Sequence, residues 1–278
     1  MITIKHPIEF PNTYPLDRIG PLKDLLFFDI ETTGFSGETS QLYLIGCSYF
    51  DGFGWKLIQW FADTRQAEKE LLDAFFEFLK RFKILIHFNG DRFDIPYLLK
   101  CCERLGLDYH FDDLISIDIF KKIKPYRKLL KLENMKQKSI EQFLGIARTD
   151  KYNGGQLIEV YKDYLMTHEQ NLYDLLILHN DDDLKGMPSI LPILNYPDFL
   201  EHPFTLSDQE IVDEPDANGH FRHLLKLTCK SFCSIPVPVK ASMAPARCTM
   251  EKDQITFFVE LTEGTLKHFY PDYKDYYY

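Results

Sequence analysis

The amino-acid sequence predicts an α/β fold on a mixed sheet, with three antiparallel strands followed by parallel strands and helices on both faces. Two patterns carry this prediction. Strand-like runs joined by turn residues come first, and apolar runs then alternate with helical patterns. The chain has 278 residues, of which 45% are hydrophobic. It can therefore bury one full core and stabilise a smaller appendage.

The first three runs have the length and aromatic content of buried strands. They cover residues 25–30, 42–50 and 55–61. The turn-forming residues 51–54, which include two glycines, separate the second run from the third. Strands joined in this way pair with their neighbours, so an antiparallel meander is expected.

Helices and further strands follow the meander. Apolar residues recur at helical spacing over residues 65–82, and the next elements are a strand at 84–88, a helix at 94–105 and a strand at 114–120. This alternation is typical of a mixed sheet with crossover helices. Beyond it the patterns predict helices only, one opening at Ser139, one over 155–165, and one over 168–187 that ends at Pro188.

The two ends of the chain differ in composition from its middle. Prolines recur near the start without periodicity, which predicts an extended N-terminal arm over residues 1–20. Beyond residue 191, Pro-rich and β-branched segments such as 255–261 predict a boundary near 192–200. The expected organisation is a main domain at 21–192 and a β-rich C-terminal segment at 193–278. The aromatic residues 270–278 suggest a sheet edge or a truncated end.

The sequence also bears on the compartment. No run approaches the roughly 20 apolar residues of a membrane span, and the first residues lack the apolar core of a secretory signal. The six cysteines form no regular disulfide framework, and the spacing of the C-terminal cysteines and histidines matches no common zinc finger. We therefore expect a cytoplasmic protein with reduced thiols and no membrane partner.

The net charge of −10 argues against a nucleic-acid partner if it is taken alone, because phosphate binding depends on Lys and Arg contacts. However, the charges are not evenly distributed along the sequence. Residues 121–138 carry eight basic side chains and a single acid. This basic stripe is either a solvated surface or a surface that attracts phosphates.

Two acids interrupt the first apolar run. Asp29 and Glu31 stand one residue apart, so strand alternation places both side chains on the same face. Neighbouring buried carboxylates repel and favour a compensating hard cation, although acids also end edge strands in solvent. The pair therefore indicates either a divalent metal site or an exposed strand end.

Two later segments add further acids. Asp94 follows an Asn-Gly turn and starts a helix, where it either binds metal or caps the helix. His179 and Asp183 stand four residues apart on a helix and share a face. The neighbouring Asp181 and Asp182 are alternative ligands if the helix has a different register.

Residues 28–34, 89–94 and 179–183 resemble, in this order, the three exonuclease motifs of the DEDD superfamily, whose fold is ribonuclease-H-like. The chain is most similar to the bacterial YprB-like branch, whose third motif typically reads Tyr or His, Asn, two variable residues and Asp. Residues 153–155 and 161–165 also resemble that branch. The similarity covers residues 21–192 and does not extend to the C-terminal segment.

This resemblance implies that Asp29, Glu31, Asp94 and Asp183 ligate two divalent cations, Mg²⁺ or Mn²⁺, and that His179 positions or deprotonates the attacking water. Two such ions activate water on one side of the phosphorus and neutralise the leaving oxygen on the other. One departure concerns the spacing. Families with a histidine usually place the motif's Asp five positions later, whereas this chain places it four later, as the tyrosine families do.

The expected function is 3′–5′ exonuclease action on DNA or RNA, at single-stranded or 3′ ends. The alternatives are a structure-specific endonuclease of the same fold and a nucleic-acid-binding module without catalysis. Asp118 caps a helix, is exposed to solvent, or supports the metal ligands without contacting the ions. A packing role is the alternative for Phe93. The candidate substrate contacts are a hydroxyl, an amide, a ring and three lysines: Thr32, Asn89, Phe93, Lys121, Lys122 and Lys124.

Overall fold

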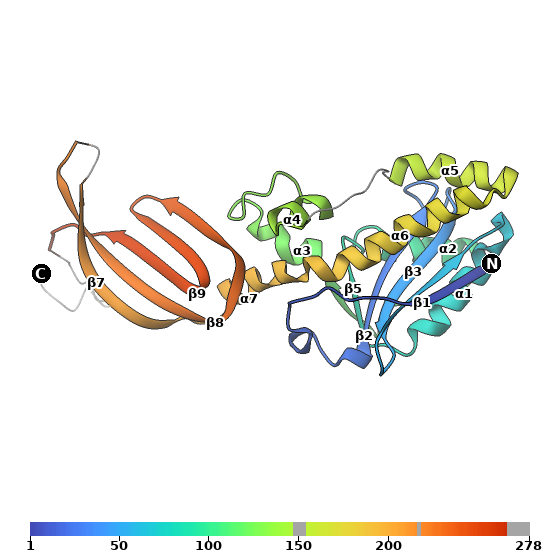
Figure 1. Ribbon diagram of the computed structural model, residues 1–278, viewed down its shortest axis with the longest axis horizontal. Helices are drawn as coiled ribbons and strands as arrows, with labels where there is room; N and C mark the ends of the chain where they lie inside the picture. Colours follow the sequence, from blue (N-terminus) through green and yellow to red (C-terminus); the bar gives the residue numbers. More distant parts are fainter. Residues whose placement is uncertain (147–153, 216–217, 266–278) are drawn as a thin grey trace, which may run out of the picture. The chain divides into compact units, whose positions relative to one another are not determined.

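The computed structural model describes residues 1–146, 154–215 and 218–265. The chain divides into two compact units (Figure 1). The first comprises Met1–Glu201 with Ile235–Val237, and the second comprises His202–Ser234 with Pro238–Tyr278.

A six-stranded mixed sheet organises the first unit, with the strand order β1-β4-β3-β2-β5-β6. The pairs β1–β4, β4–β3 and β3–β2 are antiparallel, and β2–β5 and β5–β6 are parallel. The predicted fold class is therefore confirmed. The strands are β1 (Ile2–Pro7), β2 (Leu25–Thr32), β3 (Leu42–Phe50), β4 (Trp55–Phe61), β5 (Ile84–His87) and β6 (Ile115–Asp118).

The start of the chain differs from the expected arm over residues 1–20. Residues 2–7 form the edge strand β1, which pairs with β4 from Ile2 opposite Phe61 to Pro7 opposite Lys56. Ile2 and Ile4 pack against the core, and Pro7 ends the strand at an edge, where proline removes no necessary ladder bond. Each pairing partner lies at least 49 residues away, so local composition could not reveal it.

Helices cover both faces of this sheet. Neighbouring strand residues point to opposite faces, and Phe28 stacks on Phe75 of α1 whereas Asp29 bonds to Asn180 of α6. Figure 1 shows α6 running across the sheet. The helices are α1 (Glu68–Leu79), α2 (Asp94–Leu105), α3 (Ile119–Ile123), α4 (Gln137–Phe143), α5 (Gly154–Thr167), α6 (Gln170–Ile190) and α7 (Asn195–Glu201).

Two predicted boundaries are wrong. The strand expected over 114–120 ends at Asp118, because the Asp118 carboxylate accepts the Lys121 N–H and caps α3. The last helix continues past Pro188 to Ile190. Its buried Met187 and Ile190 hold it to the core, which offsets the roughly 3 kcal/mol that an internal proline costs.

The second unit is a three-stranded antiparallel sheet with the order β7-β8-β9. Its strands are β7 (Thr205–Pro215), β8 (Phe221–Met243) and β9 (Ala246–Glu260), so the predicted β-rich character of the C-terminal segment is confirmed. The first unit extends to residue 201 because α7 carries the buried Tyr196 and Phe199. The expected motif residue Asn153 and the tail 270–278 lie outside the described residues. No helix in the described ranges has the length and apolar character of a membrane span.

Candidate metal centre

Three elements bring carboxylates to one edge of the six-stranded sheet. β2 supplies Asp29 and the buried Glu31, and Asp94 is the first residue of α2, directly after the turn that follows β5. Because β2 and β5 are parallel neighbours, their carboxyl ends meet at the same edge. Asp183 of α6 completes the group, since its charge acts on both Asp29 and Glu31.

Burial and mutual repulsion dominate the electrostatics of this group. Burial, followed by the charges of Glu31, Asp94 and Asp183, raises the pKa of Asp29 well above its usual value. Burial and the charges of Asp183 and Asp94 raise the pKa of Glu31 to about 8. Burial also raises the pKa of Asp94 to about 7, although hydrogen bonds from backbone N–H groups oppose the rise. A bound cation would relieve this repulsion.

His179 lies between two of the acids. Its Nε2 is 3.6 Å from Oε1 of Glu31 and 3.4 Å from Oδ2 of Asp183. These three ligand atoms lie within 4.8 Å of one another, close enough to share an ion. Carboxylate oxygens fit a hard divalent cation such as Mg²⁺ or Mn²⁺, and the imidazole lies beside the same position.

The register of α6 separates the three consecutive aspartates. Asp181 faces another direction, where its carboxylate contacts His6 at 3.0 Å and also pairs with Lys185. Asp182 is exposed. The structure therefore brings Asp183, rather than either alternative ligand, to the other acids.

Asp118 shapes the turn that precedes Asp94. Its carboxylate accepts backbone N–H groups from Asn89 at 2.9 Å, Asp91 at 3.3 Å and Lys121 at 3.2 Å. Capping by Asp118 is thus observed, and its side chain is buried rather than exposed to solvent. The charge of Asp118 also contributes to the raised pKa of Asp94.

A second group of possible ligand atoms surrounds the same turn. In the described parts of the chain, such groups number two: Glu31, His179 and Asp183, and His87, Asp91 and Asp118. In the second group, the Nδ1 of His87 accepts the Gly90 N–H at 3.0 Å, and its Nε2 is 2.8 Å from the Ser116 hydroxyl. The hydrogen bonds of this group therefore serve the turn rather than an ion.

The candidate substrate residues lie around the same edge. The Thr32 hydroxyl donates to the Gly34 carbonyl at 2.7 Å, so it is already engaged in the turn. Asn89 adopts the left-handed backbone conformation, with φ of 66°. Phe93 is partly buried, and its ring centroid lies 5.7 Å from that of Tyr97, so packing accounts for part of its role.

The basic stripe begins directly after β6. Since β6 runs parallel to β5, Lys121, Lys122 and Lys124 follow the carboxyl end of the sheet, which is the edge that carries the acids. All three lysines are exposed. The Lys121 ammonium lies 2.9 Å from the Asp91 carboxylate, so a phosphate would compete with this ion pair.

Sequence reasoning missed Phe35. Its side chain is 94% exposed, and its ring centroid lies 6.3 Å from that of Phe93. The available signal was a large aromatic residue in the polar loop directly after the first motif. One ring comes from the loop after β2 and the other from the residue directly before Asp94, and together they offer an aromatic surface.

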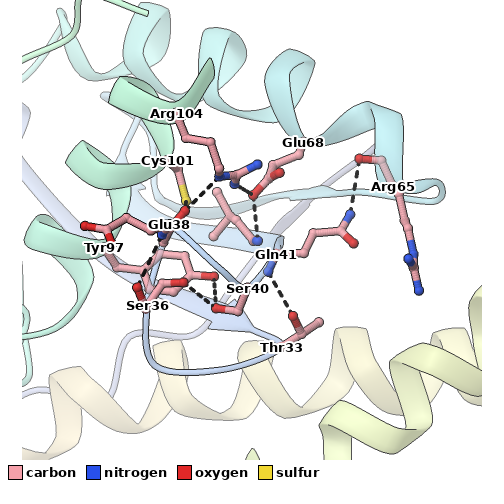
Figure 2. A network of polar contacts seen from close by, with 12 residues as sticks. Thr33, Ser36, Glu38, Ser40, Gln41, Arg65, Glu68, Tyr97, Cys101 and Arg104 are labelled. Atoms are coloured by element: carbon pink, nitrogen blue, oxygen red, sulfur yellow. Dashed lines mark hydrogen bonds and ion pairs between the residues drawn. The ribbon is translucent and has the colours of Figure 1, made fainter. Parts of the chain in front are cut away.

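A polar network anchors the loop that carries Phe35 (Figure 2). The Glu68 carboxylate accepts the Leu42 N–H and the Arg104 guanidinium, each at 2.8 Å. Arg104 also donates to the Gly37 carbonyl at 2.8 Å. The loop is thereby attached to α1 through Glu68 and to α2 through Arg104.

Comparison with known proteins places this fold in a family. The sequence model of the RNase_H superfamily matches residues 26–195, more than half of the chain. The chain belongs to the RNase_H superfamily.

Relatives from archaea have more specific descriptions. A DNA polymerase of Thermococcus kodakarensis is 32% identical over 120 aligned residues, and the match covers 38% of this chain and 7% of the polymerase. A DNA polymerase of Thermococcus sp. strain 9oN-7 is 33% identical over 122 aligned residues, and the match covers 38% of this chain and 16% of the polymerase. The family B DNA polymerase of Pyrobaculum calidifontis has a similar fold, with a TM-score of 0.51 at 15% identity over 63% of this chain and 25% of that one. The chain thus spans a small part of each polymerase.

The raised pKa values predict an unusual pH dependence of the metal-free protein. The pKa of Glu31 rises from 4.5 to about 8 on folding, so the folded state binds this proton more tightly than the unfolded state. The resulting stability is fully present below the unfolded pKa and is lost as the pH rises through the folded pKa. In EDTA, the Tm of Glu31→Gln minus that of wild type should therefore increase between about pH 5 and pH 8. Thermal unfolding measures this difference in Tm. A difference that does not change with pH would show that folding does not raise the pKa of Glu31.

Proposed function

We propose that the chain is a divalent-metal-dependent nuclease that hydrolyses phosphodiester bonds of DNA or RNA, with 3′–5′ exonuclease action. The observation that carries the proposal is the convergence of Asp29, Glu31, Asp94 and Asp183 at one sheet edge, where burial and repulsion raise pKa values. Membership of the RNase_H superfamily and the partial similarity to DNA polymerases support it.

Each residue has a role in this proposal. The four carboxylates hold two ions, which when bound supply an activated water and neutralisation of the leaving oxygen. His179, with its Nε2 beside Glu31 and Asp183, orients the attacking water or accepts its proton. Asn89 contacts the terminal nucleotide through its amide. The rings of Phe35 and Phe93 also hold this nucleotide, because aromatic rings stack on any base.

Two finer parts of the proposal, the 3′–5′ polarity of cleavage and the branch of the superfamily, rest on the sequence motifs. The third motif, with His179, Asn180 and Asp183, has the pattern of the YprB-like branch, and we propose this branch as the chain's affiliation. The basic stripe attracts phosphates to a site whose own carboxylates repel them.

End-labelled single-stranded and double-stranded DNA and RNA, incubated with Mn²⁺ or with EDTA, test the proposal. Stepwise shortening from the 3′ end, present with Mn²⁺ and abolished by EDTA, is the expected result. Internal cuts would instead identify an endonuclease. Binding without any cleavage would identify a nucleic-acid-binding module.

Two neighbouring aspartates provide a matched test of the ligand assignment. Asp183→Asn should abolish cleavage, because it removes one of the four carboxylates proposed to hold the ions, a group whose charge acts on Asp29 and Glu31. Asp182→Asn makes the same chemical change at the exposed adjacent position and should cleave at the wild-type rate. The measurement is the initial rate on a labelled substrate with Mn²⁺. The reverse pattern would show that α6 presents Asp182 to the metals.

His179→Ala should lower the cleavage rate by about 10²–10⁴-fold, the usual contribution of a positioned acid–base group. Affinity for Mn²⁺, measured by calorimetry, should change far less, and His179→Tyr should retain part of the activity because the spacing to Asp183 suits a tyrosine. A parallel fall in Mn²⁺ affinity would assign His179 as a ligand. A rate loss of less than about threefold would assign it a structural role.

Replacing Lys121, Lys122 and Lys124 with Gln should weaken binding of all sequences alike. The logarithmic salt slope should flatten by about two units, because each phosphate contact on a single strand contributes about 0.7. Turnover at saturating substrate should change little. The matched control replaces Lys23, Lys80 and Lys83, exposed lysines that precede β2 and β5 at the opposite sheet edge. If both triple variants change affinity and salt slope equally, the basic stripe contributes only through the net charge of the protein.

A further inference from the structure

Three residues form a row across the central strands beneath α6. Asp29 of β2 pairs with Gly46 of β3, and Gly46 pairs with Gln59 of β4. Directly paired residues point to the same face of a sheet. The two polar side chains at the ends of the row therefore flank a position that has no side chain.

Asn180 of α6 occupies the space above Gly46. A Cβ atom at position 46 would lie 1.9 Å from the Asn180 Oδ1 and 2.5 Å from Cδ1 of Leu184. A larger residue at this position would therefore displace the side chains of Asn180 and Leu184. The glycine allows the Asn180 amide to reach the sheet, where Asn180 and Gln59 are both fully buried.

Hydrogen bonds join these side chains into one chain. The Gln59 Nε2 donates to the Ile177 carbonyl and to the Asn180 Oδ1, each at 3.0 Å. The Asn180 Nδ2 then donates to Oδ2 of Asp29 at 2.9 Å. The chain begins on the backbone of α6 and ends on an acid of the candidate metal centre.

The backbone carbonyl fixes the direction of every bond in this chain. A carbonyl only accepts, so the Gln59 amide must turn its NH₂ group toward Ile177. Its second hydrogen then faces Asn180, which must present its oxygen there and its own NH₂ group to Asp29. This direction leaves the Gln59 Oε1 buried without a hydrogen-bond partner among the described residues. The direction of the chain is therefore set by the two contacts of the Gln59 NH₂ group, with the Ile177 carbonyl and with the Asn180 Oδ1.

We propose that Gln59 and Asn180 form an amide relay that holds Asp29 by its Oδ2 atom and leaves its Oδ1 atom to ligate a divalent cation. This inference rests on the proposed metal-dependent function. Asn180 and Gln59 are positioning residues, because they act through Asp29 and touch neither the ions nor the substrate. Hydrogen bonds to a ligating carboxylate fix its orientation, and their loss typically weakens metal affinity by about 10–100-fold.

The test uses two substitutions that keep the approximate shape of each side chain but remove its hydrogen bonds. Asn180→Leu removes the donor to Asp29, and Gln59→Met removes the group that orients Asn180. Asn180→Leu should weaken Mn²⁺ affinity by about 10–100-fold and lower kcat, with the KM for nucleic acid changed by less than about threefold. Gln59→Met should have a smaller effect of the same kind. The double variant should match Asn180→Leu alone, because Gln59 acts only through Asn180.

Two further variants separate positioning from general damage to the fold. Ser48→Ala removes a buried hydroxyl of β3 that has no hydrogen-bond partner in the described part of the chain, and it should leave Mn²⁺ affinity unchanged. Gly46→Ala retains every polar group but displaces Asn180, so it should weaken Mn²⁺ binding even if Asn180→Leu fails to fold. Calorimetry with Mn²⁺ alone measures affinity, and circular dichroism establishes that each variant is folded.

The outcomes distinguish the relay from the function on which it rests. A wild-type protein that neither binds Mn²⁺ nor cleaves nucleic acid would overturn both. A wild-type protein that binds and cleaves, while folded Asn180→Leu, Gln59→Met and Gly46→Ala keep its Mn²⁺ affinity, would overturn the relay alone. Additive losses in the double variant would also overturn it, because they would show that Gln59 acts independently of Asn180.

Discussion

Carboxylates shielded from water repel one another, and the first unit holds Asp29, Glu31, Asp94 and the partly buried Asp183 together at one edge of its sheet. The repulsion opposes folding unless the surrounding structure forces the acids to stay close. Three elements hold the acids in place: the central strand β2, the helix α2 that starts beside it, and the long helix α6 across the face of the sheet. Strand and helix packing thus stabilises an arrangement that its own charges destabilise, which is typical of a site built to receive cations.

Buried polar groups outside the acidic cluster support each of these elements. Asn180 bonds to Asp29, Asp118 orders the turn before Asp94, and Glu68 anchors the loop after the first motif. Each of these side chains comes from a different element. A buried hydrogen-bonded network has few alternative arrangements, so it restricts the positions of the acids more tightly than apolar packing would.

Charge is distributed unevenly over the chain. The overall excess of acid would repel a polyanion, but the basic stripe follows β6 at the carboxyl edge of the sheet. Lys121 is paired with Asp91. Local charge at this edge therefore matters more for a phosphate-bearing partner than the net charge of the protein.

Local pattern in the sequence predicted much of the fold and the acids of the candidate site. Strands 42–50 and 55–61 and helix 94–105 lie where periodicity and turn residues placed them, because these features depend on neighbouring residues. The motif spacing also singled out the four acids. Asn180 was visible in the third motif, but nothing near it in the sequence indicated a partner.

Tertiary structure decided the features that depend on distant partners. The edge strand β1 exists because β4 pairs with it, and α6 passes Pro188 because the core buries its last turn. Gln59 is 121 residues from Asn180 in the sequence, and Asn180 is 151 residues from Asp29. A hydrogen bond between such residues depends on how helix and sheet pack, so only the folded chain shows which amide meets which acid.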